Sequence, residues 1–172
     1  MNYLSVDGIS KSYGIKTLFS DVTFGIEKGD KTALIASNGS GKSTLLRIIV
    51  GRESMDSGTV TFANDIRVGY LEQLPQYDPE LTIREVIAQG HSDLDSVETL
   101  TYEQRLIQML TRFELTDLEL KIGSLSGGQV KRLALAMVLL DDPDLLILDE
   151  PTNHLDITRS EERRVGKECR SR

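Results

Sequence analysis

The stretch that decides the fold reads Ala36-Ser37-Asn38-Gly39-Ser40-Gly41-Lys42-Ser43. An apolar segment, residues 31–36, runs into it and predicts a short β-strand. The apolar residues of the segment that follows, 42–50, have the spacing of a buried helix that ends at Gly51. A strand, a glycine-rich loop and a helix in this order are the setting of a phosphate-binding loop.

Phosphate binding needs backbone N–H groups at a helix N-terminus, a cation for the β and γ phosphates and a hydroxyl for Mg²⁺. The strict loop pattern begins with glycine, and Ala36 takes that place. The alanine weakens the site only if its position requires a positive φ. The plain alternative is a glycine turn that happens to carry a lysine. The candidate ligand-binding residues are Ser37, Asn38, Gly39, Ser40, Gly41, Lys42, Ser43 and Thr44, with Ser43 also a candidate ligand of Mg²⁺.

A second motif is an apolar strand, residues 145–148, that ends in Asp149 and Glu150. Ligands bind at the carboxyl ends of strands in an open parallel sheet. We therefore expect Asp149 to reach Mg²⁺ and Glu150 to orient or deprotonate a water molecule. Without the phosphate loop upstream, a solvated strand end would be the better explanation of the two carboxylates.

A third motif is Leu125-Ser126-Gly127-Gly128-Gln129, which by itself fits the cap of a helix reaching residue 140. With the phosphate loop, the acidic strand and Pro151-Thr152-Asn153-His154-Leu155-Asp156, it resembles the ATP-binding cassette (ABC) ATPases. The resemblance spans residues 1–157. It implies an α/β fold of the P-loop NTPase type, with an N-terminal antiparallel β subdomain, a parallel-sheet core and a helical subdomain at about 74–140.

The same resemblance implies ATP and Mg²⁺ as ligands and assigns roles to further residues. Tyr13 matches the aromatic residue that stacks on adenine; otherwise it is a half-buried strand tyrosine. Gln73 matches a catalytic glutamine that contacts Mg²⁺ and the attacking water; otherwise it is a surface residue. Residues of the third motif match those that touch the γ-phosphate held by an opposite cassette: Ser126, Gly127, Gly128 and Gln129.

Several other elements follow from local patterns. Strands are predicted at 4–9, 22–26, 59–62 and 67–71. Thr82 and Glu85 have the spacing of a capping box that opens a helix, and residues 102–110 have helical spacing.

The branch of the family is indicated by smaller features. Residues 153–156 and 69–73 resemble ABC-F proteins, which implies a cytoplasmic ATPase with two cassettes in one chain that acts on ribosomes. The net charge of −7 is awkward for a ribosome binder, and 88–110 is short for an ABC-F arm. Two alternatives are the ATPase subunit of a transporter, and a nucleotide-gated binding module with little turnover. The expected partner is a second cassette, which lies either in the same chain or in the other copy of a homodimer.

Composition excludes several other classes of protein. The longest apolar run, 133–140, has eight residues, so we expect no membrane insertion. Cys169 is the single cysteine, which excludes a disulfide framework and a cysteine-based metal site.

The last fourteen residues, 159–172, differ from the rest. They carry six basic and three acidic groups, whereas residues 1–158 carry 14 basic and 24 acidic groups. Their sequence, RSEERRVGKECRSR, resembles the translation of a sequencing-adapter oligonucleotide, so we expect a non-native tail. Residues 1–158 are then a partial cassette, incomplete at the C-terminus, with exposed apolar surface and no hydrolysis of its own.

Overall fold

The computed structural model describes residues 1–90 and 96–150, and of these it does not describe the side chains of 96–101 and 103. The chain forms two compact units. The first contains residues 1–73 and 138–149, and the second contains residues 74–137 together with Glu150. The predicted tail at 159–172 and the motif at 151–156 lie outside the described residues.

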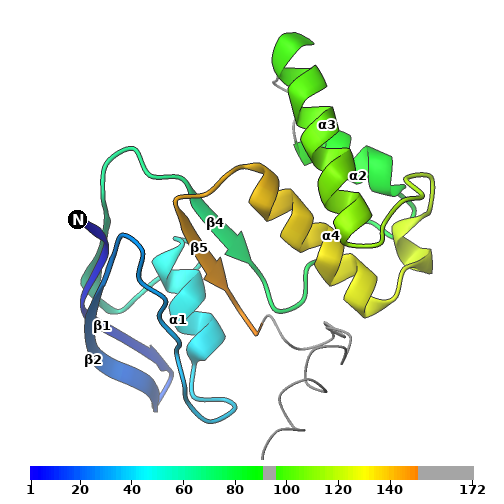
Figure 1. The fold of residues 1–172 in the computed structure, drawn as a ribbon. Helices are drawn as coiled ribbons and strands as arrows, with labels where there is room; N and C mark the ends of the chain where they lie inside the picture. The colour runs from blue at the N-terminus through cyan, green and yellow to red at the C-terminus, as the bar shows by residue number, and fades with distance from the viewer. Residues whose placement is uncertain (91–95, 151–172) are drawn as a thin grey trace, which may run out of the picture. The chain divides into compact units, whose positions relative to one another are not determined.

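The first unit contains an antiparallel sheet with strand order β2-β1-β3, of which Figure 1 labels β1 and β2. β1 is Asn2–Tyr13, β2 is Lys16–Glu27 and β3 is Ser57–Phe62. Gly58 has φ +96°, and an added Cβ would lie 2.5 Å from the carbonyl carbon of Gly8, so β3 approaches β1 this closely only with glycine. The strands predicted at 4–9, 22–26 and 59–62 are confirmed. β1 and β2 are longer than the apolar pattern indicated, because their ladder continues through polar residues.

A parallel pair, β4 (Val68–Leu71) and β5 (Leu145–Leu148), completes the first unit's strands (Figure 1). Leu71 pairs with Leu148, so the two carboxyl ends lie at the same edge. Helix α1 (Lys42–Ile49) shares the first unit's core with both sheets. That core includes Leu4, Val6, Ile9, Leu45, Ile48, Ile49, Leu145 and Ile147.

Gly69 lets a helix end approach β4 closely. A Cβ at this position would lie 2.7 Å from Cγ1 of Val138 and 3.0 Å from Cγ of Pro143. Val138 belongs to the last turn of α4 (Gly127–Leu140). Any larger residue at position 69 would push that turn off the strand.

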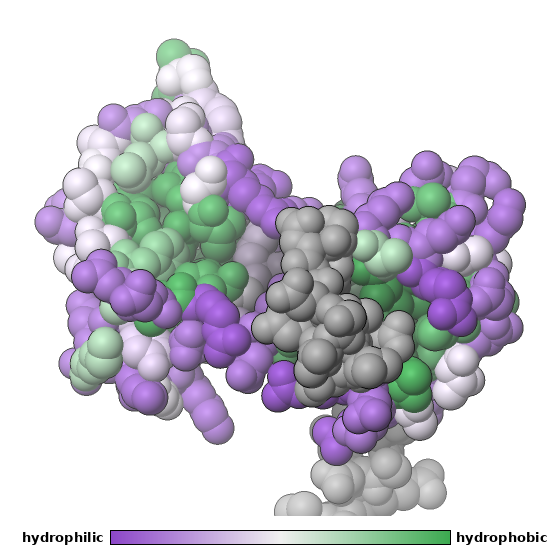
Figure 2. All heavy atoms as spheres, turned by 90° about the horizontal axis from the view of Figure 1, so that it is seen from above, coloured by the Kyte–Doolittle hydropathy of each residue, from purple (hydrophilic) through white to green (hydrophobic). Residues whose placement is uncertain are grey.

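The strand predicted at 31–36 is wrong for this structure. These residues form no ladder, and Leu34 and Ile35 are 46% and 89% exposed. None of the described strands is hydrogen-bonded to this segment, since β5 pairs with β4 alone, and a strand forms only where a second strand takes up its backbone hydrogen bonds. The expected exposed apolar surface is therefore present at this segment, and Figure 2 shows apolar residues gathered in patches on a mostly polar face.

The second unit is helical. It contains α2 (Ile83–Gly90), α3 (Ser96–Arg112), a 3₁₀ turn at Ile122–Ser124 and most of α4. The predicted capping box is confirmed, since the Thr82 N–H donates to Glu85 Oε2 at 2.7 Å and the Glu85 N–H donates to Thr82 Oγ1 at 3.2 Å. Buried residues of this unit include Ile83, Val86, Leu106, Leu110, Ile122 and Leu133. None of the helices in the described ranges combines the length and the apolar character needed to cross a membrane.

Candidate nucleotide-binding site

Two glycines of the loop at 36–44 lie in the left-handed region. Gly39 has φ +76°, and Gly41, the N-cap of α1, has φ +97°. A Cβ at Gly41 would lie 2.6 Å from Cγ of Leu18, so both the backbone and the available space require glycine. No side chain caps α1 and its first turn carries no acidic residue. The helix therefore presents its first backbone N–H groups, and the positive end of its dipole, at the loop.

Lys42 and Ser40 give the loop the polar groups that a phosphate needs. Lys42 Nζ donates to the carbonyl oxygens of Ala36 and Ser37 at 2.9 and 3.1 Å, so the ammonium group lies within the loop. Ser40 Oγ is buried and has no hydrogen-bond partner, an arrangement that a bound phosphate oxygen would satisfy. Ala36 is not in the left-handed region, so the replacement of the first glycine causes no backbone strain.

Tyr13 lies close to the first turn of α1. Its hydroxyl donates to the Glu53 carboxylate, and this bond is the largest cause of a raised Tyr13 pKa. Hydrogen bonding to the Thr44 hydroxyl lowers the pKa of Tyr13. Tyr13 is 52% exposed, which leaves room for a planar group beside the ring. The structure thus places Tyr13, the predicted adenine contact, in the same unit as the glycine loop and α1.

The residues predicted to hold Mg²⁺ come from α1 and from the carboxyl ends of β4 and β5. Asp149 is 3% exposed, and its N–H donates to the Leu71 carbonyl oxygen at 2.9 Å. Gln73 follows β4 by two residues, so it lies beyond the same sheet edge. In the described part of the chain no group of three or more His, Cys, Asp or Glu residues has the geometry of a metal site. The predicted set contains only one carboxylate, so a site built from Ser43, Gln73 and Asp149 would complete its coordination with phosphate oxygens and water.

The Asp149 carboxylate also acts on a neighbouring tyrosine. Burial is the main cause of a raised pKa at Tyr70, and the negative charge of Asp149 adds to it. The Asp149 carboxylate therefore lies close enough to Tyr70 to act on its hydroxyl. Tyr70 itself packs against the first unit's core.

Glu150 adopts an unusual backbone conformation for a residue with a side chain. Its φ is +47°, and its carbonyl oxygen accepts a hydrogen bond from Nζ of Lys131 on α4. Non-glycine residues in the left-handed region are often found where function holds them. Within the second unit, this conformation is supported by α4, the helix that begins at the motif 125–129, which we call the signature motif.

The motif at 125–129 forms the cap of α4. The Gln129 N–H donates to Ser126 Oγ at 3.3 Å, and the Ser126 N–H donates to Gln129 Oε1 at 2.9 Å. Nothing lies within 4 Å of a Cβ placed on Gly127, so this side of the helix start is open. The capping interpretation is correct, and it leaves the N-terminus of α4 accessible to a further ligand.

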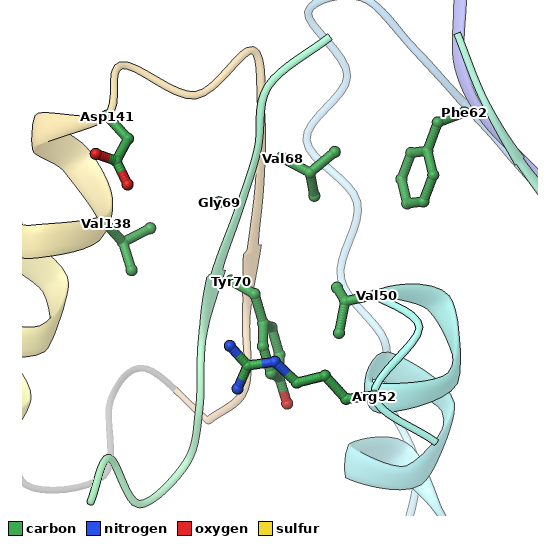
Figure 3. Close-up of a pocket in the computed structure, with 8 residues that line it drawn as sticks. All are labelled: Val50, Arg52, Phe62, Val68, Gly69, Tyr70, Val138 and Asp141. Atoms are coloured by element: carbon green, nitrogen blue, oxygen red, sulfur yellow. The ribbon is translucent and has the colours of Figure 1, made fainter. Parts of the chain in front are cut away.

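The first unit also contains a cavity of about 350 Å³ beside β4 (Figure 3). The Arg52 guanidinium lies over the Tyr70 ring, 5.1 Å from its centroid. The lining residues are Val50, Arg52, Phe62, Val68, Gly69, Tyr70, Val138 and Asp141, none of which the sequence predicted as a site residue.

Two residues around Tyr13 were missed by the sequence analysis, Lys11 and Glu53. The sequence does indicate that Lys11 is buried, because it follows Ile9 by two residues and so lies on the same, inward face of β1, where it is 7% exposed. Glu53 has no such signal, because its contact with Tyr13 joins residues 40 positions apart.

Together the glycine loop, its lysine and the acidic strand end define a nucleotide-binding domain of the P-loop class. A family model described as "ABC transporter" matches residues 19–153, and the chain belongs to this family. The family binds ATP with Mg²⁺ and in general hydrolyses it.

Relatives come from both branches considered above. The chain is 35% identical over 192 residues to "Uncharacterized ABC transporter ATP-binding protein YfmR" of Bacillus subtilis, covering 91% of this chain and 30% of the relative. It is 37% identical over 155 residues to "Energy-dependent translational throttle protein EttA" of Escherichia coli, covering 90% and 28%. The chain thus spans about 30% of the length of these curated relatives.

Solved structures confirm the predicted fold class. One described as an ATP binding subunit of an ABC transporter has a TM-score of 0.79 at 29% identity, covering 90% of this chain and 69% of that chain. A nucleotide-free ATP-binding cassette from an ABC transporter has a TM-score of 0.67 at 28% identity, covering 88% and 70%.

Proposed function

We propose that this chain is an ATP-binding cassette that binds MgATP through the loop at 36–44 and takes part in its hydrolysis. The observation that carries the proposal is the loop itself: left-handed Gly39 and Gly41, Lys42 inside the loop and the unpartnered Ser40 hydroxyl. In this proposal residues 37–44 bind the phosphates. Tyr13 stacks on adenine, and residues 1–158 are part of one cassette with its helical subdomain at about 74–140.

The chain's own residues supply the chemistry of hydrolysis. Lys42 neutralises charge on the β and γ phosphates, and Gln73 orients the attacking water. Glu150 accepts the proton of that water on a carboxylate oxygen. Bound Mg²⁺, held by Ser43, Gln73 and Asp149, would supply further charge neutralisation on the phosphates.

Ser126, Gly127, Gly128 and Gln129 are proposed to contact the γ-phosphate of a nucleotide held by a second cassette, in the same protein or in a homodimer. The open surface at Gly127 supports this role. Hydrolysis then depends on two cassettes coming together.

For the biological role, we propose a cytoplasmic ABC-F protein that acts in translation at the ribosome. The similarity to EttA, whose name describes a translational throttle, supports it. A transporter ATPase subunit is the second candidate, favoured by the names of YfmR and of the similar structures. Turnover stimulated by ribosomes would favour the first candidate, and co-purification with a membrane protein would favour the second.

The test of nucleotide binding is Lys42→Ala, with ATP affinity measured by isothermal titration calorimetry. We expect binding to be abolished, because the variant removes the loop's cation. Lys121→Ala is the matched control, since Lys121 pairs with the exposed Glu80 in the second unit. Unchanged affinity in Lys42→Ala would exclude this lysine from the site.

A further inference from the structure

The end of β1 is hydrogen-bonded to the loop that follows α1, residues 53–56. The Ser12 N–H donates to Asp56 Oδ2 at 2.7 Å, and Lys11 Nζ donates to the Ser54 carbonyl oxygen at 2.7 Å. Neither bond uses the Glu53 side chain. The loop therefore keeps its place against β1 independently of what that side chain does.

Glu53 is the point where this loop reaches Tyr13. Its carboxylate accepts the Tyr13 hydroxyl, lies 3.2 Å from Arg47 Nε and lies 3.9 Å from Lys11 Nζ. Arg47 belongs to α1, so the carboxylate is held from both the helix and β1. Its side chain is only 20% exposed, in contrast to the paired carboxylates of Glu119 and Glu80, which are 69% and 77% exposed.

Two contacts orient the Tyr13 ring, one at its hydroxyl and one at its face. The hydroxyl is bound by Glu53, and Lys11 Nζ lies 5.2 Å from the ring centroid, within the range of a cation–π contact. Lys11 is 7% exposed, whereas Tyr13 is 52% exposed. The ring is therefore oriented by protein contacts while about half of the residue stays open to solvent.

We propose that Glu53 is a positioning residue for nucleobase binding, which holds the Tyr13 ring in the orientation that stacks on adenine. This inference rests on the proposed function, because it requires Tyr13 to contact the base. An aromatic side chain that is already ordered loses less conformational freedom when a base stacks on it. Glu53 would therefore strengthen the base-dependent part of ATP affinity and leave the phosphate-dependent part unchanged.

The experiment compares the affinities of ATP and inorganic triphosphate for the full chain by calorimetry. The variants are Glu53→Leu, Tyr13→Phe, the double variant and Tyr13→Ala. Phenylalanine keeps the ring and removes the hydroxyl that Glu53 binds. Glu27→Leu is the matched control, since Glu27 is an exposed carboxylate at the opposite end of the β1–β2 ladder.

We expect Glu53→Leu and Tyr13→Phe each to weaken ATP by about 2- to 10-fold, the change that corresponds to ordering one side chain on binding. Triphosphate affinity should not change. In the double variant the loss should not exceed that of either single variant, because both remove the same bond. A merely structural role for Glu53 would instead weaken both ligands together.

An unchanged ratio of ATP to triphosphate affinity in Glu53→Leu would overturn the inference, as would equal losses for both ligands or a full additional loss in the Tyr13→Phe background. Tyr13→Ala separates this outcome from failure of the proposed function. It should weaken ATP by about 5- to 150-fold, the range of one aromatic–base stack. If Tyr13→Ala leaves the ratio unchanged, Tyr13 does not contact the base, and the inference about Glu53 falls together with the stacking role of Tyr13, whereas phosphate binding by the loop is tested separately by Lys42→Ala.

Discussion

At the residue scale, the site depends on conformations that few residues adopt. Gly39 and Gly41 occupy the left-handed region in the phosphate loop, and Glu150 occupies it after β5. The glycines do so at no steric cost, whereas Glu150 is held there although it carries a side chain. The loop residues were therefore recognisable from glycine spacing, and the conformation of Glu150 was not.

Gly41→Ala is expected to destabilise the chain by more than backbone strain alone. A left-handed alanine costs about 1–2 kcal/mol, and the new methyl group would also lie 2.6 Å from Leu18. Gly29→Ala is the control, because Gly29 has φ +89° with nothing within 4 Å of an added Cβ. Urea unfolding should show a larger loss for Gly41→Ala. Equal losses would mean that Leu18 moves aside freely.

Glu150→Gln separates binding from chemistry. We expect it to preserve ATP affinity and to slow hydrolysis by about 10²- to 10⁴-fold, the usual contribution of a positioned base. The measurement is phosphate release, with ATP affinity determined in parallel. Both are measured on a form of the protein that hydrolyses ATP. A variant that hydrolyses ATP at the original rate would remove Glu150 from the catalytic role.

At the scale of elements, helix starts carry much of the local stability and the chemistry. α2 begins with a reciprocal Thr82–Glu85 box, α4 with a Ser126–Gln129 box, and α1 with no side-chain cap. A helix in water is usually capped by a side chain, because its first N–H groups lack partners. The uncapped start of α1 therefore fits the expectation that its cap is a phosphate.

The α2 cap predicts a pH dependence of stability. Bonds from the Thr82 backbone and hydroxyl lower the Glu85 pKa below its ordinary value of 4.5. A lowered pKa in the folded state means that the stabilisation is fully present above pH 4.5 and is lost as the pH falls through the folded value. The urea concentrations at the unfolding midpoints of the unsubstituted protein and of Glu85→Gln should therefore differ at neutral pH and become equal at acidic pH. A difference that stays constant down to about pH 3 would contradict this assignment.

At the scale of the whole molecule, the signature motif and the phosphate loop belong to different units of the chain. In the proposed function, the motif of one cassette completes the site of another. The segment 31–36, which leads into the phosphate loop, also has no ladder among the described residues. In that proposal, a single copy of this chain does not form a complete site by itself.

We therefore expect the purified chain to bind nucleotide weakly and to release phosphate at no more than the background rate at low protein concentration. The measurement is phosphate release over a series of protein concentrations, with Glu150→Gln as the control. Turnover per molecule that is robust, independent of protein concentration and lost in Glu150→Gln would show that one copy holds a complete site.

The sequence by itself determined the features that arise within a few residues. These are the glycine loop before α1, the capping boxes at 82–85 and 126–129, and the apolar strand that ends at Asp149. Each depends on backbone conformation and near neighbours, so residue type and spacing are sufficient to predict it. The family-level fold followed because these local motifs occur in one order.

Only the tertiary structure decided which distant residues meet. It paired Tyr13 with Glu53, brought Val138 against Gly69 and left 31–36 without a strand partner. A β-strand and a side-chain contact both need a second segment, and the first segment alone does not specify which one. The apolar pattern of 31–36 therefore predicted a strand that the structure does not form, because a strand requires backbone hydrogen bonds to a second strand and no described strand supplies them to this segment.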